Sequence, residues 1–361
     1  MATYKSIRYI VPVEAVEHTD SINALSDVDT DTTAPTDGQI LKWNNTTSKW
    51  YPGDVEEAAA TTTQKAIFGY GYTNTRTTIT NLVSSTGVVA TDTNAAGTAK
   101  DAGAAAGYGG DKAIFGFANM DTNGGNETNL VSNTGVVSSD VTGVGTIRNG
   151  VSAAGFGGDK AIFGFGATSA ATNITNLVSN TGVVATDTTG VGTARGTLAA
   201  AGFGGDKAIF GFGTDDYSDS DLSITNLVSN TGVVATDTTG ASGVTGRREL
   251  AAAGYGGDKA IFGFGKGDDN YGYINYIYNI TNLVSNTGVV ASDTTGVGTA
   301  KRELYGAGYG GDKAIFGYGY DGSNRVNHTN LVSNAGVVAS DTTGVGTARD
   351  GVAAAGYSTT A

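Results

Sequence analysis

The sequence predicts an all-β fold, a six-bladed β-propeller preceded by a small N-terminal module, and three observations lead to this prediction. The tetrapeptide AIFG occurs six times, beginning at Ala66, Ala113, Ala161, Ala208, Ala260 and Ala314. A repeat of about 50 residues is typical of propeller blades or of helical arrays. Glycine is very frequent, with 57 residues, and no segment spaces its apolar residues as a helix does. Helical arrays are therefore excluded.

The composition excludes several classes of function. The net charge is −13, so the acidic chain is not expected to bind nucleic acid. The chain has no cysteine, which excludes disulfides and thiolate chemistry. We find neither a secretory signal nor a transmembrane run at the N-terminus, and we expect no insertion into a membrane.

Residues 1–60 lie outside the repeats and are expected to form a separate module. Lys5–Val13 (KSIRYIVPV) alternates enough to add a strand to the sheet of a partner. The segments GQILKW and SKWYPG are predicted as two short strands around the polar turn NNTT, and they contain both tryptophans, Trp43 and Trp50.

The stretch Leu25–Val55 resembles a module of tail fibres and other structural proteins of bacteriophages, especially phages of marine cyanobacteria. Its pattern is matched at Leu25, Asp27, Val28, Asp37, Gly38, Gln39, Leu41, Trp43, Trp50, Pro52 and Gly53. The resemblance implies a protein of the phage particle whose residues 1–60 attach to other virion proteins. We assign this attachment to Tyr9, Ile10, Trp43 and Trp50. A hairpin that only caps the propeller is the alternative.

Residues 61–361 are expected to form the propeller, with four strands in each blade. The segments LAAAGYG and KAIFGFG form a hairpin around GGD, and TNLVS and GVVAT form a second hairpin around NTG, where glycine supplies a positive φ. Within AIFGFG, the alanine and both aromatic residues are expected to point one way and the isoleucine and glycines the other. A phenylalanine of one blade then fills the hollow left by a glycine of the next.

The run Thr193–Gly213 resembles the repeat of kelch-type β-propellers. It has an arginine, small and apolar residues, a glycine turn and a strand that ends in a glycine-rich pair. Valine stands where kelch repeats have tryptophan, and Gly-aromatic-Gly replaces the double glycine. The resemblance therefore supports the fold more than a function.

The C-terminus holds a third block without the AIFG that follows it elsewhere. We predict that Val352–Tyr357 completes the blade begun at Ala66, which closes the ring and leaves no open sheet edge. The alternative is that Ala58–Thr63 fills this place.

Between AIFG and TNLV the repeats differ in sequence, and these inserts occupy the same place in every blade, so they are expected to form one surface. The longest insert contains tyrosines at alternating positions, which suggests an extended hairpin. Exposed tyrosine with asparagine and aspartate is typical of surfaces that bind carbohydrate or protein. The predicted receptor-binding residues are Tyr271, Tyr273, Tyr276, Tyr278, Asp215, Asp216, Tyr217 and Tyr320. A solvated hairpin whose tyrosines pack on a neighbour is the alternative.

The remaining charged residues are predicted to be structural. The acidic insert with Asp215, Asp216, Asp219 and Asp221 lacks the spacing of an EF-hand, and we favour a solvated loop over a Ca²⁺ site. Recurring charges should support loops through hydrogen bonds or ion pairs; they are Asp92, Asp187 and Asp237 with Lys100, Arg195 and Arg349. We identify no catalytic residue, metal or cofactor, and we do not expect an enzyme.

These observations predict a phage structural protein, either a tail fibre or an adhesin, whose propeller loops bind a host surface glycan or protein. A capsid decoration or head-fibre protein without receptor binding is the first alternative. A propeller hydrolase or lyase is the second. It needs carboxylates that occur in only one or two blades near the axis, and we do not recognise such residues in the sequence.

Overall fold

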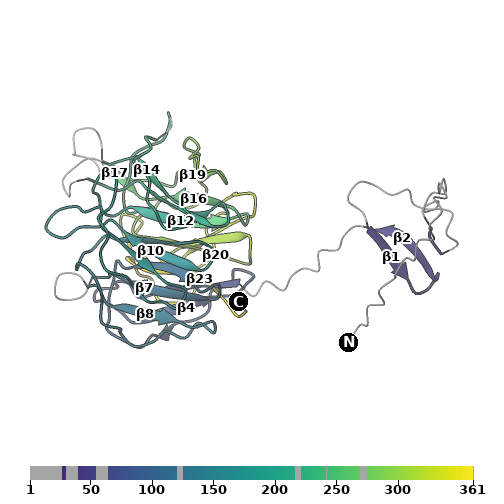
Figure 1. Cartoon of the computed structure of the whole chain (residues 1–361). Helices are drawn as coiled ribbons and strands as arrows, with labels where there is room; N and C mark the ends of the chain where they lie inside the picture. The colour runs from purple at the N-terminus through teal and green to yellow at the C-terminus, as the bar shows by residue number, and fades with distance from the viewer. Residues whose placement is uncertain are drawn as a thin grey trace, which may run out of the picture. The chain divides into compact units, whose positions relative to one another are not determined.

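The computed structural model describes residues 27–29, 40–53, 64–119, 125–215, 221–240, 242–268 and 275–360 (Figure 1). The chain divides into two compact units, Met1–Ala60 and Thr61–Ala361. The regular elements of the described residues are all β-strands, and nothing among them is a helix long and apolar enough to cross a membrane.

The first unit contains the predicted tryptophan hairpin. Strands β1 (Ile40–Asn44) and β2 (Lys49–Gly53) pair antiparallel with Trp43 opposite Trp50. The Asn44 side chain caps the turn, because its Oδ1 accepts hydrogen bonds from the amides of Thr46 and Thr47 at 2.9 and 3.2 Å.

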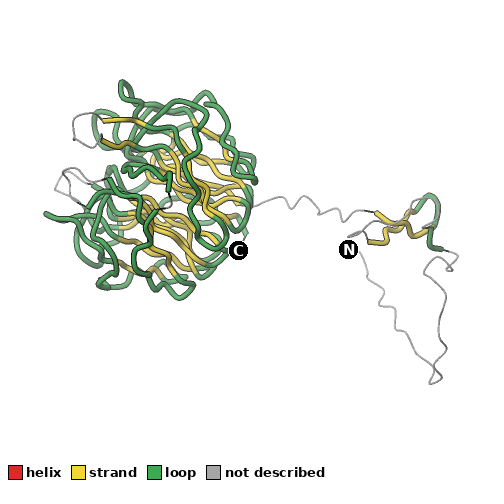
Figure 2. The backbone as a smooth tube through the Cα atoms, turned by 90° about the horizontal axis from the view of Figure 1, so that it is seen from above, coloured by secondary structure: helices red, strands yellow, loops and turns green. Residues whose placement is uncertain are grey.

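The second unit contains six antiparallel sheets, one for each copy of AIFG, which we number in chain order. Sheet 1 is β23 (Ala353–Ser358), β3 (Gln64–Gly69), β4 (Ile79–Val83) and β5 (Thr93–Asn94); sheet 2 is β6 (Ala104–Tyr108), β7 (Lys112–Gly116) and β8 (Thr128–Val131); sheet 3 is β9 (Ser152–Phe156), β10 (Lys160–Gly164) and β11 (Thr175–Val178); sheet 4 is β12 (Ala199–Phe203), β13 (Lys207–Gly211) and β14 (Thr225–Val228); sheet 5 is β15 (Ala251–Tyr255), β16 (Lys259–Gly263) and β19 (Thr281–Val284); sheet 6 is β20 (Tyr305–Tyr309), β21 (Lys313–Gly317) and β22 (Thr329–Val332). A further hairpin, β17 (Lys266–Asp268) with β18 (Asn275–Ile277), belongs to the longest insert. In Figure 2 the strands occupy the interior of this unit and the loops surround them.

The C-terminal strand pairs with the first strand of the repeats, as predicted. Strand β23 pairs with β3, with Ala353 opposite Gly69 and Tyr357 opposite Lys65. The first strands of the sheets contact one another in the cyclic order β6, β9, β12, β15, β20, β23 and back to β6. These inner strands therefore surround a common central axis, with no first or last sheet.

Neighbouring sheets interlock through phenylalanine and glycine, which confirms the predicted packing. A Cβ atom on Gly164 would lie 2.7 Å from Cζ of Phe210 in the next sheet, so only glycine fits there. The same relation joins Gly317 of sheet 6 to Phe68 of sheet 1 across the closure. At each contact the phenylalanine ring fits only because the glycine that faces it has no side chain.

The prediction that both aromatic residues of AIFGFG point the same way is wrong. Phe163 packs toward Phe117 of the preceding sheet, whereas Phe165 packs toward Phe210 of the following sheet. The reason is the backbone at Phe165, where φ is +64° and the alternation of the strand ends. Every interface between sheets thus receives one ring from each side, with centroids 4.9–5.5 Å apart.

The predicted fourth strand is reduced to isolated bridges in five of the six sheets. In sheet 3 these bridges join Val178 to Val184 and Thr175 to Thr188. Between these two bridges the chain of β11 advances by three residues, whereas the facing segment advances by four. The facing segment therefore has one extra residue, which is a β-bulge. The extra residue allows Asp187 to leave the ladder and accept hydrogen bonds from Thr146. The edge of each sheet is therefore irregular, which hinders pairing with another chain.

Candidate functional site

All six variable inserts begin at the same end of the sheets, which we call the loop end. The first residues of the inserts form backbone bridges to the segments that precede the inner strands, as between Tyr72 and Asp350 or Tyr320 and Arg302. The predicted common position of the inserts is confirmed. At the opposite end lie the GGD hairpins, which join the first two strands in sheets 2 to 6.

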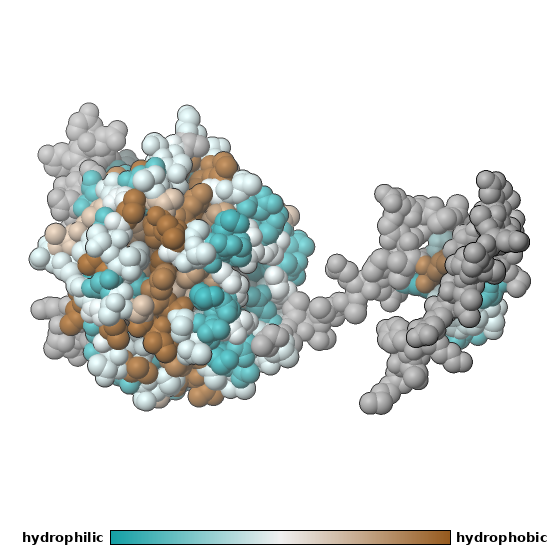
Figure 3. All heavy atoms as spheres, viewed as in Figure 1, coloured by the Kyte–Doolittle hydropathy of each residue, from teal (hydrophilic) through white to brown (hydrophobic). Residues whose placement is uncertain are grey.

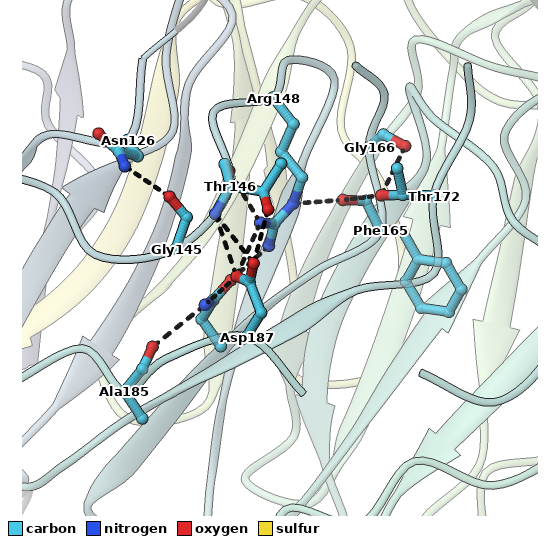
Figure 4. A network of polar contacts seen from close by, with 10 residues as sticks. Asn126, Gly145, Thr146, Arg148, Phe165, Gly166, Thr172, Ala185 and Asp187 are labelled. Carbon is cyan, nitrogen blue, oxygen red and sulfur yellow. Dashed lines mark hydrogen bonds and ion pairs between the residues drawn. The ribbon is translucent and has the colours of Figure 1, made fainter. Parts of the chain in front are cut away.

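A recurring buried cation holds each of these preceding segments in place. Arg148 donates from Nε to the carbonyl oxygen of Phe165 at 2.8 Å and from Nη2 to Oδ1 of Asn176 at 2.6 Å (Figure 4). Asp187 accepts hydrogen bonds from the amide and hydroxyl of Thr146 in the same network. Burial lowers the pKa of Arg148 to about 10, so the guanidinium remains charged at neutral pH. The predicted structural role of these charges is confirmed.

The residues two positions after each buried cation form a ring around the central axis, and backbone hydrogen bonds link five of its six neighbouring pairs. The amide of Glu303 donates to the carbonyl of Glu249 at 2.9 Å, and the amide of Gly351 donates to the carbonyl of Glu303 at 3.0 Å. All six members of this ring have positive φ: Ala102, Gly150, Thr197, Glu249, Glu303 and Gly351. Only two of them carry charge, so the ring is asymmetric at Glu249 and Glu303.

Beside these two glutamates lies a cavity of about 280 Å³ on the axis, which we call the axial cavity. Its wall includes Asp101, Glu249 and Glu303 with Leu250 and Leu304. Tyr305 lines both this cavity and a smaller one of about 30 Å³ among the alanines of the inner strands. The residue at this position is alanine or serine in the other five sheets, namely Ala104, Ser152, Ala199, Ala251 and Ala353.

A second, larger cavity of about 730 Å³ opens between the inserts of sheets 1 and 6, and we call it the loop cleft. It shares Asp101 and Glu303 with the axial cavity. Its remaining lining residues are Tyr72, Thr73, Asn74, Arg302, Tyr320, Ser323, Asn324, Arg325, Ala348 and Asp350. The two cavities therefore lie next to each other and share part of their walls.

Cations hold the acids and rings of the loop cleft in position. Arg325 lies over the ring of Tyr72 at 4.8 Å and donates to Asp350 at 3.2 Å. Arg302 lies over the ring of Tyr320 at 5.0 Å. These contacts fix planar charged groups against aromatic faces before any ligand arrives.

Burial and mutual repulsion perturb the acids of the site. Burial, followed by the negative charges of Glu249 and Asp350, raises the pKa of Glu303 to about 7, although the neighbouring Arg302 lowers it. Burial also raises the pKa of Asp101 and of Asp350. The pKa of Glu249 is lowered despite its burial, because Lys266 and Arg302 bind its two oxygens at 2.8 and 2.6 Å. The site therefore holds a carboxyl group that exchanges protons near neutral pH.

Of the predicted binding residues that the structure describes, only Tyr320 lines this site. Tyr276 and Tyr278 stack in the hairpin of the longest insert with centroids 6.3 Å apart, and Tyr276 is exposed. Asp215 is exposed. Tyr271, Tyr273, Asp216 and Tyr217 lie outside the described residues.

The predicted residues of the N-terminal module and of the acidic insert likewise lie partly within and partly outside the described residues. Trp43 and Trp50 are exposed, with ring centroids 5.4 Å apart, whereas Tyr9 and Ile10 lie outside the described residues. Asp221 pairs with Arg248 at 2.7 Å. Among the described residues, no group of three or more histidine or acidic side chains is arranged to hold a metal ion.

The analysis of the sequence missed the two axial glutamates. They follow the buried cations in the letters REL at 248–250 and 302–304, where the other repeats have smaller or uncharged residues. The statement that no carboxylates are unique to one or two repeats near the axis is therefore wrong. An alignment of the six repeats shows glutamate at this position in only two of them, and this is the signal that identifies these residues.

The surface formed by the repeated segments exposes nearly the same side chains in all six sheets. The first valine of each GVV turn is exposed by 65–66% in all six sheets. In the view of Figure 3, apolar residues alternate with hydrophilic areas on the second unit. Such repeated features carry less information about a ligand than the asymmetric loop end.

No protein-family model and no curated protein sequence matches the chain. The site is therefore the basis for any statement about function.

Proposed function

We propose that the protein is a phage virion protein, a tail fibre or adhesin, whose residues 61–361 form a six-bladed β-propeller that binds a saccharide of the host surface. The loop cleft carries this proposal, because residues that depart from the repeat gather there into one concave site. The cyclic contacts of the inner strands and the pairing of β23 with β3 support the propeller.

The chemistry of the cleft suits a sugar. Tyr72 and Tyr320 provide aromatic rings, Asn74, Ser323 and Asn324 provide neutral polar groups, and arginines and carboxylates provide charged donors and acceptors. Saccharides present apolar ring faces and many hydroxyl groups, which bind to this combination of side chains. A volume of about 730 Å³ lies within the range of ligand sites.

Residues 1–60 are proposed to attach the protein to other virion components. Exposed Trp43 and Trp50 give the hairpin an aromatic surface, and the resemblance of Leu25–Val55 to phage modules supports the same role. Antibody labelling of intact particles distinguishes the alternatives: label at the tail tip agrees with an adhesin, whereas label over the capsid indicates a decoration protein.

The first test measures binding of the full chain to purified surface polysaccharide of the host. We expect Arg325→Ala to weaken binding by about tenfold, which corresponds to about 1.4 kcal/mol, because Arg325 supports Tyr72 and faces the cleft. Tyr276→Ser is the matched control, since Tyr276 is exposed on another insert. Loss of binding in the control alone would place the receptor surface on the longest insert instead.

The same samples test hydrolysis. We expect the polysaccharide to keep its length during incubation. Release of fragments by the wild type, abolished by Glu303→Gln, would replace binding with an enzymatic function.

A further inference from the structure

We infer that the axial cavity binds a primary ammonium group carried on a short apolar stem. This inference concerns the axial cavity alone and stands whether or not a saccharide occupies the loop cleft.

Three departures from the repeat meet at this cavity. The ring position carries glutamate in two sheets, at 249 and 303, and alanine, glycine or threonine in the other four. The large side chain of Tyr305 stands where the other sheets have alanine or serine. All six ring positions have positive φ, which glycine adopts more readily than glutamate, so the two glutamates are less favourable there than the glycines at 150 and 351. These exceptions are costly and converge on one cavity, which suggests that they serve a ligand.

The charge on the wall of the cavity is one-sided. Its charged lining residues in the described part of the chain are all acidic: Asp101, Glu249 and Glu303. The cations that bind these acids, Arg76, Arg302 and Lys266, do not line the cavity. A cation that enters therefore meets carboxylate side chains at the wall, and it shares them with Arg76, Lys266 and Arg302, which are not lining residues.

The rest of the wall favours an apolar stem with a polar end. Val151, Leu198, Leu250 and Leu304 contribute apolar surface. Tyr305 also lines the cavity, and a phenol oxygen can accept a hydrogen bond from an ammonium group. At about 280 Å³ the cavity suits a ligand of modest size, such as an alkylamine or the end of a lysine side chain.

Glu303 should make the affinity of the axial cavity for an ammonium group depend on pH. Its carboxyl faces Glu249, Asp350, Arg302 and Tyr305, and its pKa is raised to about 7. Above that pH the carboxylate attracts an ammonium ion, and below it the neutral acid does not. Affinity for an alkylamine should therefore rise by about tenfold from one pH unit below this pKa to one unit above it.

The test uses isothermal titration of the full chain with hexylamine, and with hexanol and hexanoate as neutral and anionic counterparts. We expect hexylamine to bind about tenfold more tightly than hexanol above neutral pH, and hexanoate not to bind. Glu303→Gln should weaken hexylamine binding by about tenfold and remove its pH dependence. Asp159→Asn, at the opposite end of sheet 3, is the matched control and should leave both unchanged.

Two further ligands identify the source of the ammonium group. Tighter binding of Nα-acetyl-lysine methylamide than of glucosamine indicates a lysine side chain of a partner protein. The reverse would contradict the apolar stem, because the amine of glucosamine is attached directly to the sugar ring. Equal binding of hexylamine and hexanol, no binding of hexylamine at millimolar concentration, or wild-type behaviour of Glu303→Gln would overturn the inference. Thermal melting of each variant separates loss of the site from loss of the fold.

Discussion

At the scale of single residues, the buried cations explain both the stability and the position of the site. Arg195 is fully buried, donates to the carbonyl of Phe212 and the side chain of Asn226, and lies 4.2 Å from the ring centroid of Phe165. Such a group joins two sheets through charge, hydrogen bonds and an aromatic face. The residues that follow it in the chain then arrive at the axis in a fixed orientation.

Replacing this cation is expected to be costly. Arg195→Ala leaves buried hydrogen-bonding groups without partners and should lower the free energy of unfolding by about 3 kcal/mol. Arg195→Lys is the control, because Lys100 and Lys301 occupy the same position in sheets 2 and 6. Denaturant unfolding measures both; a loss for lysine as large as that for alanine would contradict the role of the charge.

Glu303 should make stability depend on pH. Its pKa in the folded chain, about 7, lies above the ordinary value of 4.5, so the folded state binds more protons between these values. Stability contributed by this group is thus present at low pH and is lost as the pH rises through about 7. Glu303→Gln should raise the melting temperature above pH 7 and leave it nearly unchanged in acid. An equal shift at both pH values would indicate that repulsion at Glu303 is not the cause.

At the scale of elements, the sequence predicts the strands and their interlocking better than the details of their ends. The alternation of small and large residues in LAAAGYG and KAIFGFG specifies two adjacent strands, and GGD specifies their turn. The direction of Phe165 was not predictable from alternation, because its positive φ is imposed by the tertiary packing and the buried arginine. The bulge in the fourth segment likewise depends on Asp187, whose partner Thr146 lies far away in the sequence.

The glycines that face phenylalanine rings of the neighbouring sheet give a prediction at this scale. Gly164→Ala places a Cβ 2.7 Å from Phe210 and should destabilise the protein by about 1–3 kcal/mol. Adding Phe210→Leu to this variant should recover part of the loss. Gly196→Ala serves as the control, because the nearest atom to its new Cβ lies at 3.7 Å. Thermal unfolding of the variants measures the difference.

At the scale of the whole molecule, the two ends of the second unit meet in one sheet. The unmatched block at the C-terminus predicts that it pairs with the strand at Ala66, and the pairing of β23 with β3 confirms this. The candidate site was only partly predictable. Tyr320 follows from the variable inserts, but the charged axis depends on bringing Asp101, Glu249 and Glu303 together from three different sheets.

Removal of β23 tests directly whether the second unit needs its C-terminal strand to fold. A chain that ends at Gly351 lacks β23, so β3 keeps only β4 as a partner and the core around Phe68 becomes exposed. We expect it to aggregate or to lose cooperative unfolding. A chain that ends at Ser358 keeps all six residues of β23 and should melt like the full chain.

The central claim is that the asymmetric loop end of an otherwise repetitive ring is the ligand-binding site. Hydrogen exchange of the full chain with and without host surface polysaccharide tests it most directly. The account predicts new protection at residues 72–77, 101–103, 302–305 and 320–326, with no change in the GGD hairpins at the opposite end. Protection confined to those hairpins, or to residues 40–53, would contradict it.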